Sequence, residues 1–155
     1  MSLKIYLASL DKKDDIFKAL LSYFKELEQF QEHPTGQIAS EKYFEYYWTD
    51  PQRFPIVAYK DDELIGFCLL RSEEKFYSIA EFYIKPKFRR LGYGKTLLNF
   101  TLEFCKQKGI HSSIIAFSFV NNLGANIFWI SNGFIRRKEV VFENERSYCN
   151  VKDLQ

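Results

Sequence analysis

Hydrophobic residues gather in several short stretches of the chain, and these stretches predict β-strands. Such stretches are rich in β-branched and aromatic residues and are bounded by turn residues, as is typical of strands. They cover residues 3–8, 56–59, 64–70, 79–84, 112–120, 134–142 and 146–152. The three strands between residues 56 and 84 follow one another through short turns, which predicts an antiparallel meander, and the last two are expected to form a hairpin.

Apolar residues recur at helical spacing in the remaining segments. Helices are predicted over about residues 14–30, 41–48, 95–108 and 122–132. Ser40 is a candidate N-cap for the second helix, and Asn121 or Asn122 for the fourth. Gly109 and Gly133 follow the last two helices, where a left-handed residue commonly ends a helix.

The order of these elements predicts an α/β (α+β) fold over residues 1–155. We expect one domain with a mixed, mostly antiparallel sheet that is flanked by helices on both faces. The chain shows no internal repeat, low-complexity segment or linker that would divide it.

Composition narrows the class of protein. Of the residues, 46% are hydrophobic and 27% are charged, which is ordinary for a globular protein, and the net charge of +2 is too small for general nucleic-acid affinity. No apolar run reaches the length of a membrane span and there is no secretory signal, so we expect a cytoplasmic protein without a membrane partner.

Cys68, Cys105 and Cys149 are widely spaced, and His33 and His111 are isolated. We therefore expect reduced core thiols and no metal site.

Positive charge and glycine are concentrated between residues 85 and 95. Five basic residues and no acidic residue occur there, together with Gly92 and Gly94, directly before a predicted helix. Glycines allow a ligand to approach the backbone closely, and a helix N-terminus attracts anions. The spacing excludes a P-loop, because Arg89 stands where its first glycine belongs, and a dinucleotide fingerprint, because its third glycine would fall on Leu97.

Two motifs together resemble the GNAT superfamily of N-acetyltransferases. Arg89-Arg90-Leu91-Gly92-Tyr93-Gly94 resembles its Arg/Gln-x-x-Gly-x-Gly/Ala pyrophosphate loop, and residues 122–134 resemble its later motif Asn-x-x-Ala-x-x-Leu/Phe-Tyr-x-x-x-Gly-Phe. Trp129 replaces the usual tyrosine. A subgroup with Phe-Trp at this point is also similar through Ala80-Glu81-Phe82 and through Tyr47-Trp48-Thr49-Asp50-Pro51.

The resemblance implies that acetyl-CoA is the cosubstrate and assigns residues to it. The backbone of Phe82, Tyr83 and Ile84 would pair with the pantetheine arm, and one N–H there would polarise the thioester carbonyl. The pyrophosphate would lie on Arg89, Arg90, Leu91, Gly92, Tyr93, Gly94 and Lys95. The second motif would contribute Asn122, Ala125 and Phe128.

The same resemblance places a general base at Glu81, because many members carry a glutamate just before the pantetheine-pairing residues. An ordinary alkylamine is mostly protonated at neutral pH, so a base is useful. The alternative is that Glu81 is a solvated carboxylate or is paired with a Lys or Arg. Trp129 stands where the family's tyrosine is thought to protonate the leaving sulfur, and indole cannot release that proton. Tyr83 or a water is the candidate acid, with Trp129 shaping the site beside the sulfur.

Two features bear on the acceptor. Aromatic residues crowd residues 43–54, more than one helix face can bury, so two or three are expected to line a substrate cleft. Glu26, Glu28 and Glu32 either attract a cationic amine or form a solvated helix face. The sequence thus predicts transfer of an acetyl group to a primary amine of a small molecule or peptide, by a monomer or homodimer. A catalytically idle acyl-CoA-binding module is the alternative, and a nucleic-acid-binding domain is disfavoured because the basic cluster is one loop.

Overall fold

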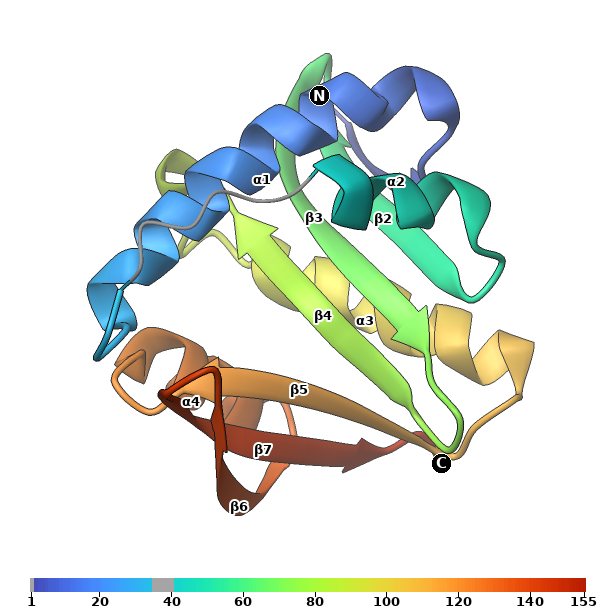
Figure 1. Ribbon diagram of the computed structural model, residues 1–155. Coiled ribbons are helices and arrows are strands. Elements are labelled where there is room, and N and C mark those ends of the chain that lie inside the picture. The colour runs from blue at the N-terminus through green and yellow to red at the C-terminus, as the bar shows by residue number, and fades with distance from the viewer. Residues whose placement is uncertain (1, 35–40) are drawn as a thin grey trace.

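The computed structural model describes residues 2–34 and 41–155, whose strands form a seven-stranded mixed sheet (Figure 1). The strands are β1 (Leu3–Leu7), β2 (Arg53–Lys60), β3 (Glu63–Ser72), β4 (Tyr77–Ile84), β5 (Ser113–Phe119), β6 (Ile135–Phe142) and β7 (Glu145–Asp153). Their order across the sheet is β1-β2-β3-β4-β5-β7-β6, and β4–β5 is the parallel pair among antiparallel neighbours. The expected mixed, mostly antiparallel sheet is confirmed.

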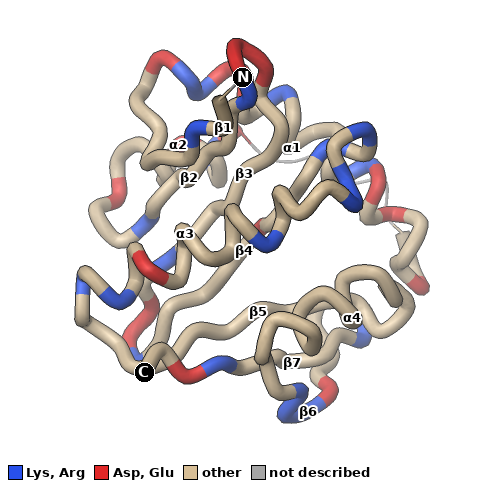
Figure 2. Tube along the Cα trace, turned by 180° about the vertical axis from the view of Figure 1, so that it is seen from behind, with Lys and Arg blue, Asp and Glu red and all other residues tan. Residues whose placement is uncertain are grey.

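Helices cover both faces of this sheet, as the hydrophobic pattern predicted. The helices α1 (Lys13–Leu27) and α2 (Glu41–Thr49) lie on the face toward the viewer in Figure 1. The helices α3 (Tyr93–Lys108) and α4 (Leu123–Ser131) lie on the other face, which Figure 2 shows from behind. Short 3-10 turns stand at η1 (Leu10–Lys12), η2 (Glu28–Phe30) and η3 (Pro86–Phe88). Two hydrophobic cores result, one between the sheet and α3 and α4, the other beneath α1 and α2.

Several boundaries differ from the sequence prediction. β2 begins at Arg53 rather than Ile56 and so includes Pro55, whose carbonyl accepts a hydrogen bond of 2.8 Å from the backbone N–H of Ala8. Proline is tolerated there because the pairing of β1 with β2 ends at Leu7 and Ile56, so the missing N–H of Pro55 breaks no hydrogen bond of that ladder. β3 continues to Ser72, and α3 begins at Tyr93, two residues before the expected start. The predicted cap at Ser40 lies outside the described residues.

The parallel strands β4 and β5 diverge soon after they meet. Their pairing covers Tyr77, Ser78 and Ile79, opposite residues 114–116, and does not extend further along β4. Figure 1 shows the two ribbons separating from this point. From Ala80 to Ile84, β4 is paired with β3 on one side only, which leaves the backbone edge toward β5 available to an extended ligand.

A β-bulge in β4 decides which face its residues occupy. Leu69 of β3 pairs with Glu81 and Leu70 pairs with Ile79, so Ala80 is the extra residue. In a regular strand Ile79 and Glu81 would point to the same face, because side chains alternate with period two. With the bulge, Ile79 belongs to the core against α3, whereas Tyr83 belongs to the core beneath α1 and α2. Glu81 accordingly faces α1 and α2.

Candidate functional site

The carboxylate of Glu81 is held by two tyrosines from different helices. Tyr23 of α1 donates a hydrogen bond of 3.0 Å from its hydroxyl to Oε1, and Tyr43 of α2 donates one of 3.1 Å to Oε2. The Tyr43 hydroxyl also lies 3.4 Å from that of Tyr47. The bulge in β4 brings Glu81 to this face, and the two helices supply the hydroxyls.

Burial among these rings raises the pKa of Glu81 to about 7. Desolvation disfavours the charged carboxylate and is the main cause, while the two tyrosine hydrogen bonds and the charge of Arg71 lower the pKa in part. Burial, and after it the charge of this carboxylate, raises the pKa values of Tyr23 and Tyr43, so both hydroxyls stay protonated as donors. A carboxyl group with a pKa near neutrality is suited to accept and release a proton.

Two arginines extend this cluster along the sheet. Arg53 of β2 and Arg71 of β3 are paired across the strands, and the guanidinium carbon of Arg53 lies 5.8 Å from the ring centre of Tyr43 and 5.5 Å from that of Tyr47. Sequence reasoning had not singled out Tyr23, Arg53 or Arg71 as site residues. Arg71 shares a face of β3 with Leu69, which is opposite Glu81, and this register is visible only in the folded sheet.

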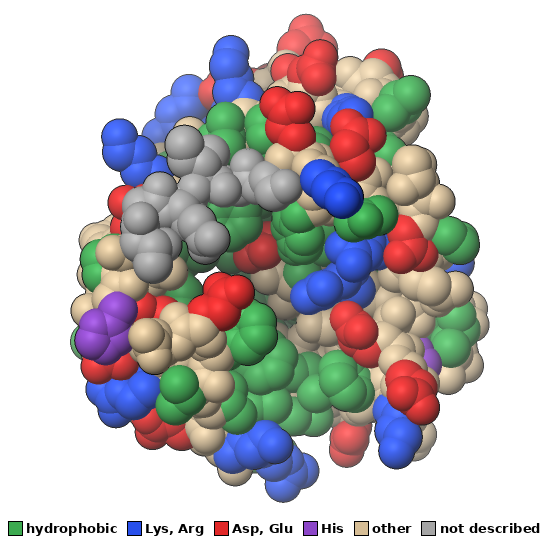
Figure 3. All heavy atoms as spheres, viewed as in Figure 1, with side chains coloured by type: hydrophobic (Ala, Val, Ile, Leu, Met, Phe, Trp, Pro, Cys, Tyr) green, Lys and Arg blue, Asp and Glu red, His purple; other side chains and the backbone are tan. Residues whose placement is uncertain are grey.

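The expected aromatic wall on residues 43–54 is divided between core and site. Phe44 and Tyr47 are buried, Tyr43 reaches Glu81, and Tyr46 is exposed beside Arg53. Figure 3 shows basic side chains at the surface below α2, next to a hydrophobic area over β5 and β7. Phe117 of β5 is half exposed on this side of the sheet.

A second part of the site is the loop that precedes α3. Gly92 is the N-cap of α3 with a φ of 87°, and a Cβ placed on it would meet no atom within 4 Å. Arg90 also has a positive φ, 62°, which is strained for a residue with a side chain. Within the described chain, no hydrogen bond is donated by the backbone N–H groups of residues 90–95. Free N–H groups at a helix N-terminus, beside Arg90 and Lys95, form a fitting cradle for a phosphate.

The basic residues of this loop are not all available to a ligand. Arg89 forms two hydrogen bonds, of 3.0 and 2.8 Å, with the carboxylate of Glu26 on α1, and its Nε donates to the carbonyl of Ile84 at 2.7 Å. Lys87 pairs with Glu63 at 2.7 Å. Arg89 therefore ties the loop to α1 and to the end of β4, and within the described chain Arg90 and Lys95 have no ion-pair partner.

The acidic residues of the first helical region are also paired. Glu26 binds Arg89, and Glu32 binds Arg146 of β7 through contacts of 2.9 and 3.1 Å. The buried carboxylate of Glu145 accepts hydrogen bonds from the backbone N–H groups of Glu32 and His33. These contacts fasten the segment after α1 to the hairpin of β6 and β7, and they neutralise two of the three carboxylates considered for attracting a cationic amine.

The residues of the second motif lie at and along α4. Asn122 is the N-cap of α4, and its side-chain oxygen accepts a hydrogen bond of 3.2 Å from the N–H of Ala125. Phe128 packs against Phe82 with ring centres 5.4 Å apart, and it would lie 3.3 Å from a Cβ placed on Gly94. Gly94 thus lets α3 approach α4 closely.

Trp129 is a core residue, 4% exposed. Its ring centre lies 5.4 Å from that of Phe82, 5.1 Å from that of Phe128 and 5.0 Å from that of Phe134. Trp129 therefore supports the face of β4 opposite Glu81, since it touches Phe82, the residue next to Glu81 along the strand.

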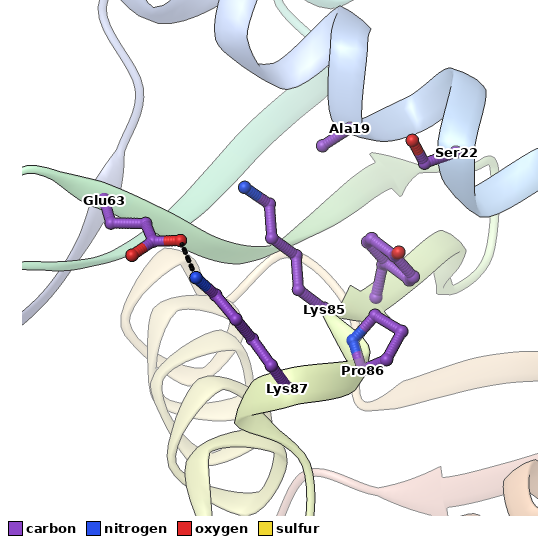
Figure 4. Close-up of a pocket in the computed structure, with 7 residues that line it drawn as sticks. Ala19, Ser22, Glu63, Lys85, Pro86 and Lys87 are labelled. Atoms are coloured by element: carbon purple, nitrogen blue, oxygen red, sulfur yellow. Dashed lines mark ion pairs between the residues drawn. The ribbon is translucent and has the colours of Figure 1, made fainter.

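Tyr83 faces α1, like Glu81, and lies under the guanidinium of Arg89 at 5.5 Å. Its pKa is raised by burial and by the charge of Glu26. Tyr83 lines a hollow of about 420 Å³ between α1 and the end of β4, drawn in Figure 4. The other lining residues are Ala19, Ser22, Glu63, Lys85, Pro86 and Lys87. The hollow does not include Glu81 or the loop of residues 89–95, so it is separate from both.

Other features of the described residues concern redox state, metals and membranes. The three cysteines are buried free thiols, as expected, and burial raises the pKa of Cys68 to about 12. Among the described residues, no cluster of His, Cys, Asp and Glu is arranged to hold a metal ion. None of the helices described is both long and apolar enough to cross a membrane.

Comparison with known proteins identifies the class of this mixed sheet, whose parallel strands diverge beside a glycine loop and a helix N-terminus. Residues 15–134 match the model of the acetyltransferase (GNAT) family. The chain belongs to this GNAT family, and acyl transfer from a coenzyme A thioester is the class of reaction that this membership supports. A search among curated proteins found no match.

Solved structures share the fold at low sequence identity. The PaiA N-acetyltransferase from Thermoplasma acidophilum, in complex with coenzyme A, is 22% identical with a TM-score of 0.74, over 99% of both chains. The spermidine N-acetyltransferase from Vibrio cholerae, in complex with CoA and spermine, is 17% identical with a TM-score of 0.77, over 98% of this chain and 95% of that one. The ribosomal-protein-S18-alanine N-acetyltransferase from Escherichia coli is 14% identical with a TM-score of 0.74, over 99% and 94%.

Proposed function

We propose that this protein transfers an acetyl group from acetyl-CoA to a primary amine by direct attack on the thioester, with Glu81 as the general base. The observation that carries the proposal is the position and environment of Glu81. It stands on β4 where the edge toward β5 is open, it is held by Tyr23 and Tyr43, and its pKa is about 7.

The coenzyme would follow the loop and the open edge of β4. The N–H groups of residues 90–95 would bind the pyrophosphate, with charge from Arg90 and Lys95 and with Arg89 holding the loop in place. The backbone of Phe82, Tyr83 and Ile84 would pair with the pantetheine arm, and Ala125 and Phe128 would pack beside it. The positive φ of Gly92 and the free N–H groups support this placement. The Asn122 side chain, engaged in capping α4, would contribute through its remaining amide donors.

The reaction then needs one proton acceptor and one proton donor. Glu81 takes the proton from the attacking nitrogen, directly or through a water, as the new N–C bond forms. A backbone N–H at the open edge of β4 stabilises the oxyanion. The C–S bond breaks, and the coenzyme thiolate takes a proton from Tyr83 or a water. A thiol of ordinary pKa, about 8.5, is a tolerable leaving group without a strong acid, which is consistent with tryptophan at position 129.

We further propose a monomer or homodimer in the cytoplasm, the location being supported by the free buried thiols.

The alternative function is a module that binds acyl-CoA without consuming it, and the tryptophan at position 129 motivates this alternative. The deciding experiment measures coenzyme binding by calorimetry and free-thiol release from acetyl-CoA with a panel of primary amines. Thiol release that depends on an amine supports the enzyme, whereas binding without any amine-dependent release supports the idle module.

A further inference from the structure

Two guanidinium groups near Glu81 have unused hydrogen-bond donors. Nη1 of Arg53 and Nε of Arg71 are buried without a hydrogen-bond partner. Each arginine has an ion-pair contact, Arg53 Nε at 3.5 Å from Asp50 and Arg71 Nε at 3.5 Å from Glu73, and neither contact is a hydrogen bond. Leaving such groups buried and unsatisfied costs free energy, so a pair of them on one surface calls for an explanation.

Both arginines lie on the face of the sheet that Glu81 occupies. Arg53 and Arg71 are opposite each other on β2 and β3, and Arg71 is two residues from Leu69, which pairs with Glu81. The charge of Arg71 is near enough to lower the pKa values of Glu81, Tyr43 and Tyr47. The arginines and the proposed base therefore belong to one continuous surface beneath α2.

The tyrosines of α2 hold the Arg53 guanidinium from one side. Its central carbon lies 5.8, 5.2 and 5.5 Å from the ring centres of Tyr43, Tyr46 and Tyr47. Aromatic faces orient a guanidinium without using its N–H groups, which stay free for an anion. A planar guanidinium with free donors matches the two oxygens of a carboxylate.

From these contacts we propose that the acceptor is an amine that also carries a carboxylate, and that Arg71 and Arg53 bind the carboxylate while the amine faces Glu81. This inference rests on the proposed function, because it names the acceptor class for that reaction. A carboxylate would satisfy the unpaired guanidinium donors, and it would place a molecule of amino acid type between the arginines and the base.

The charge around the site disfavours a polyamine as the acceptor. A polycation needs several free carboxylates along its length, but Glu26 is paired with Arg89 and Glu32 with Arg146, so of the three carboxylates considered only Glu28 is left. A second ammonium group near Arg71 would meet a like charge instead of a partner. The polyamine seen in the Vibrio cholerae relative is thus disfavoured as a guide to this chain's acceptor.

The test compares amines that differ only in their anionic group. A series of amino acids with one to five carbons between amine and carboxylate is assayed beside the matching carboxamides and spermidine, by thiol release from acetyl-CoA. We expect at least one amino acid to exceed its amide about tenfold or more in kcat/KM, as for loss of a charged hydrogen bond. Arg71→Gln should reduce this ratio several-fold, because only Arg53 is then left to bind the carboxylate. Arg137→Gln, which removes an exposed arginine on the distant strand β6, should leave it unchanged.

Two further variants guard against a folding defect. Arg71→Lys keeps the charge and should keep part of the preference, and Arg53→Gln should reduce it independently, with thermal unfolding measured for each. Equal activity on acids and amides, a preference for spermidine, or a preference that survives in folded Arg71→Gln and Arg53→Gln would overturn the inference and leave the acetyltransferase proposal standing. Coenzyme binding with no acetylation of any amine in the series would overturn the proposed function, and this inference with it.

Discussion

The hydroxyl of Tyr23 on α1 donates a hydrogen bond of 3.0 Å to Oε1 of Glu81 on β4, although the two residues are 58 positions apart in the chain. This contact joins the first helix to the strand beside which the coenzyme is proposed to bind. It also stabilises the charged form of Glu81, because a hydroxyl donor favours a carboxylate over a carboxylic acid. The protonation state of Glu81 therefore depends on how α1 packs on the sheet.

The dependence of kcat on pH should follow the protonation of Glu81. Glu81, with a pKa of about 7, is protonated and unable to accept a proton below that pH, so kcat should fall as pH drops through 7 and level off above it. Tyr23→Phe removes a hydrogen-bond donor that lowers the pKa of Glu81. The pH at which kcat falls should therefore move to a higher value. Tyr6→Phe, a tyrosine of β1 stacked on Tyr59, is the control and should leave that pH unchanged. The measurement is kcat against pH for the three proteins.

Replacing the carboxylate itself should separate chemistry from coenzyme binding. Glu81→Gln should lower kcat about a hundredfold or more, as is typical for loss of a general base, with the Kd for acetyl-CoA unchanged. The fall of kcat near pH 7 should disappear with it. Glu103→Gln on the exposed face of α3 is the matched control. Near-normal turnover in folded Glu81→Gln would mean that the carboxylate is structural and that solvent removes the proton.

Two glycines at opposite ends of α3 allow a matched test of the phosphate loop. Gly92 and Gly109 both have left-handed backbones, with φ of 87° and 65°, so valine at either position should destabilise the fold through backbone strain. Only Gly92→Val should also weaken coenzyme A binding, by about tenfold, because its side chain projects where the backbone should meet the pyrophosphate. Calorimetric titration with coenzyme A checks this. Equal affinities in the two variants would refute the loop assignment.

Replacing Arg90 with glycine should increase the stability of the fold and weaken the binding of coenzyme A. Its φ of 62° is strained for a side chain, so Arg90→Gly should raise the free energy of unfolding by up to about 1 kcal/mol. The same change removes a positive charge from the proposed pyrophosphate site, so coenzyme A should bind more weakly and with less dependence on salt. Denaturant unfolding and binding at two salt concentrations measure both effects. If Arg90→Gly bound coenzyme A as tightly as the unaltered protein, Arg90 would have no part in binding the pyrophosphate.

Trp129 is expected to act through packing. Trp129→Ala should cost about 3–5 kcal/mol of stability and impair both coenzyme and acceptor parameters, because the cavity would lie against Phe82. Trp129→Phe should keep most activity, since it retains an aromatic body. Activity as low in the phenylalanine variant as in the alanine variant would show that the indole N–H is needed. A sharp rise in kcat for Trp129→Tyr would show that a proton donor is the missing group.

Much of the fold could be predicted because its determinants are local in the chain. The hydrophobic runs of the strands, the glycines at 92, 109 and 133, and the cap at Asn122 all act within a few residues of where they stand. The two motifs were recognisable for the same reason, since a phosphate loop depends on the spacing of glycine and charge along one segment. The meander of the three strands between residues 56 and 84 was predicted, whereas the places of β1 beside β2 and of β7 between β5 and β6 come from the structure.

The surroundings of Glu81 could not be read in this way, because they come from four separate segments. One extra residue in β4 turns Glu81 toward α1 and α2, and the bulge is visible only in the register against β3. Tyr23, Tyr43 and Arg71 reach the carboxylate from α1, α2 and β3. Arg89 stood in a recognisable motif, yet its side chain binds Glu26, 63 residues away. The sequence alone thus determined the elements and indicated a candidate phosphate loop, whereas tertiary packing decided the charge state and the neighbours of Glu81, since both depend on burial and on contacts between distant segments.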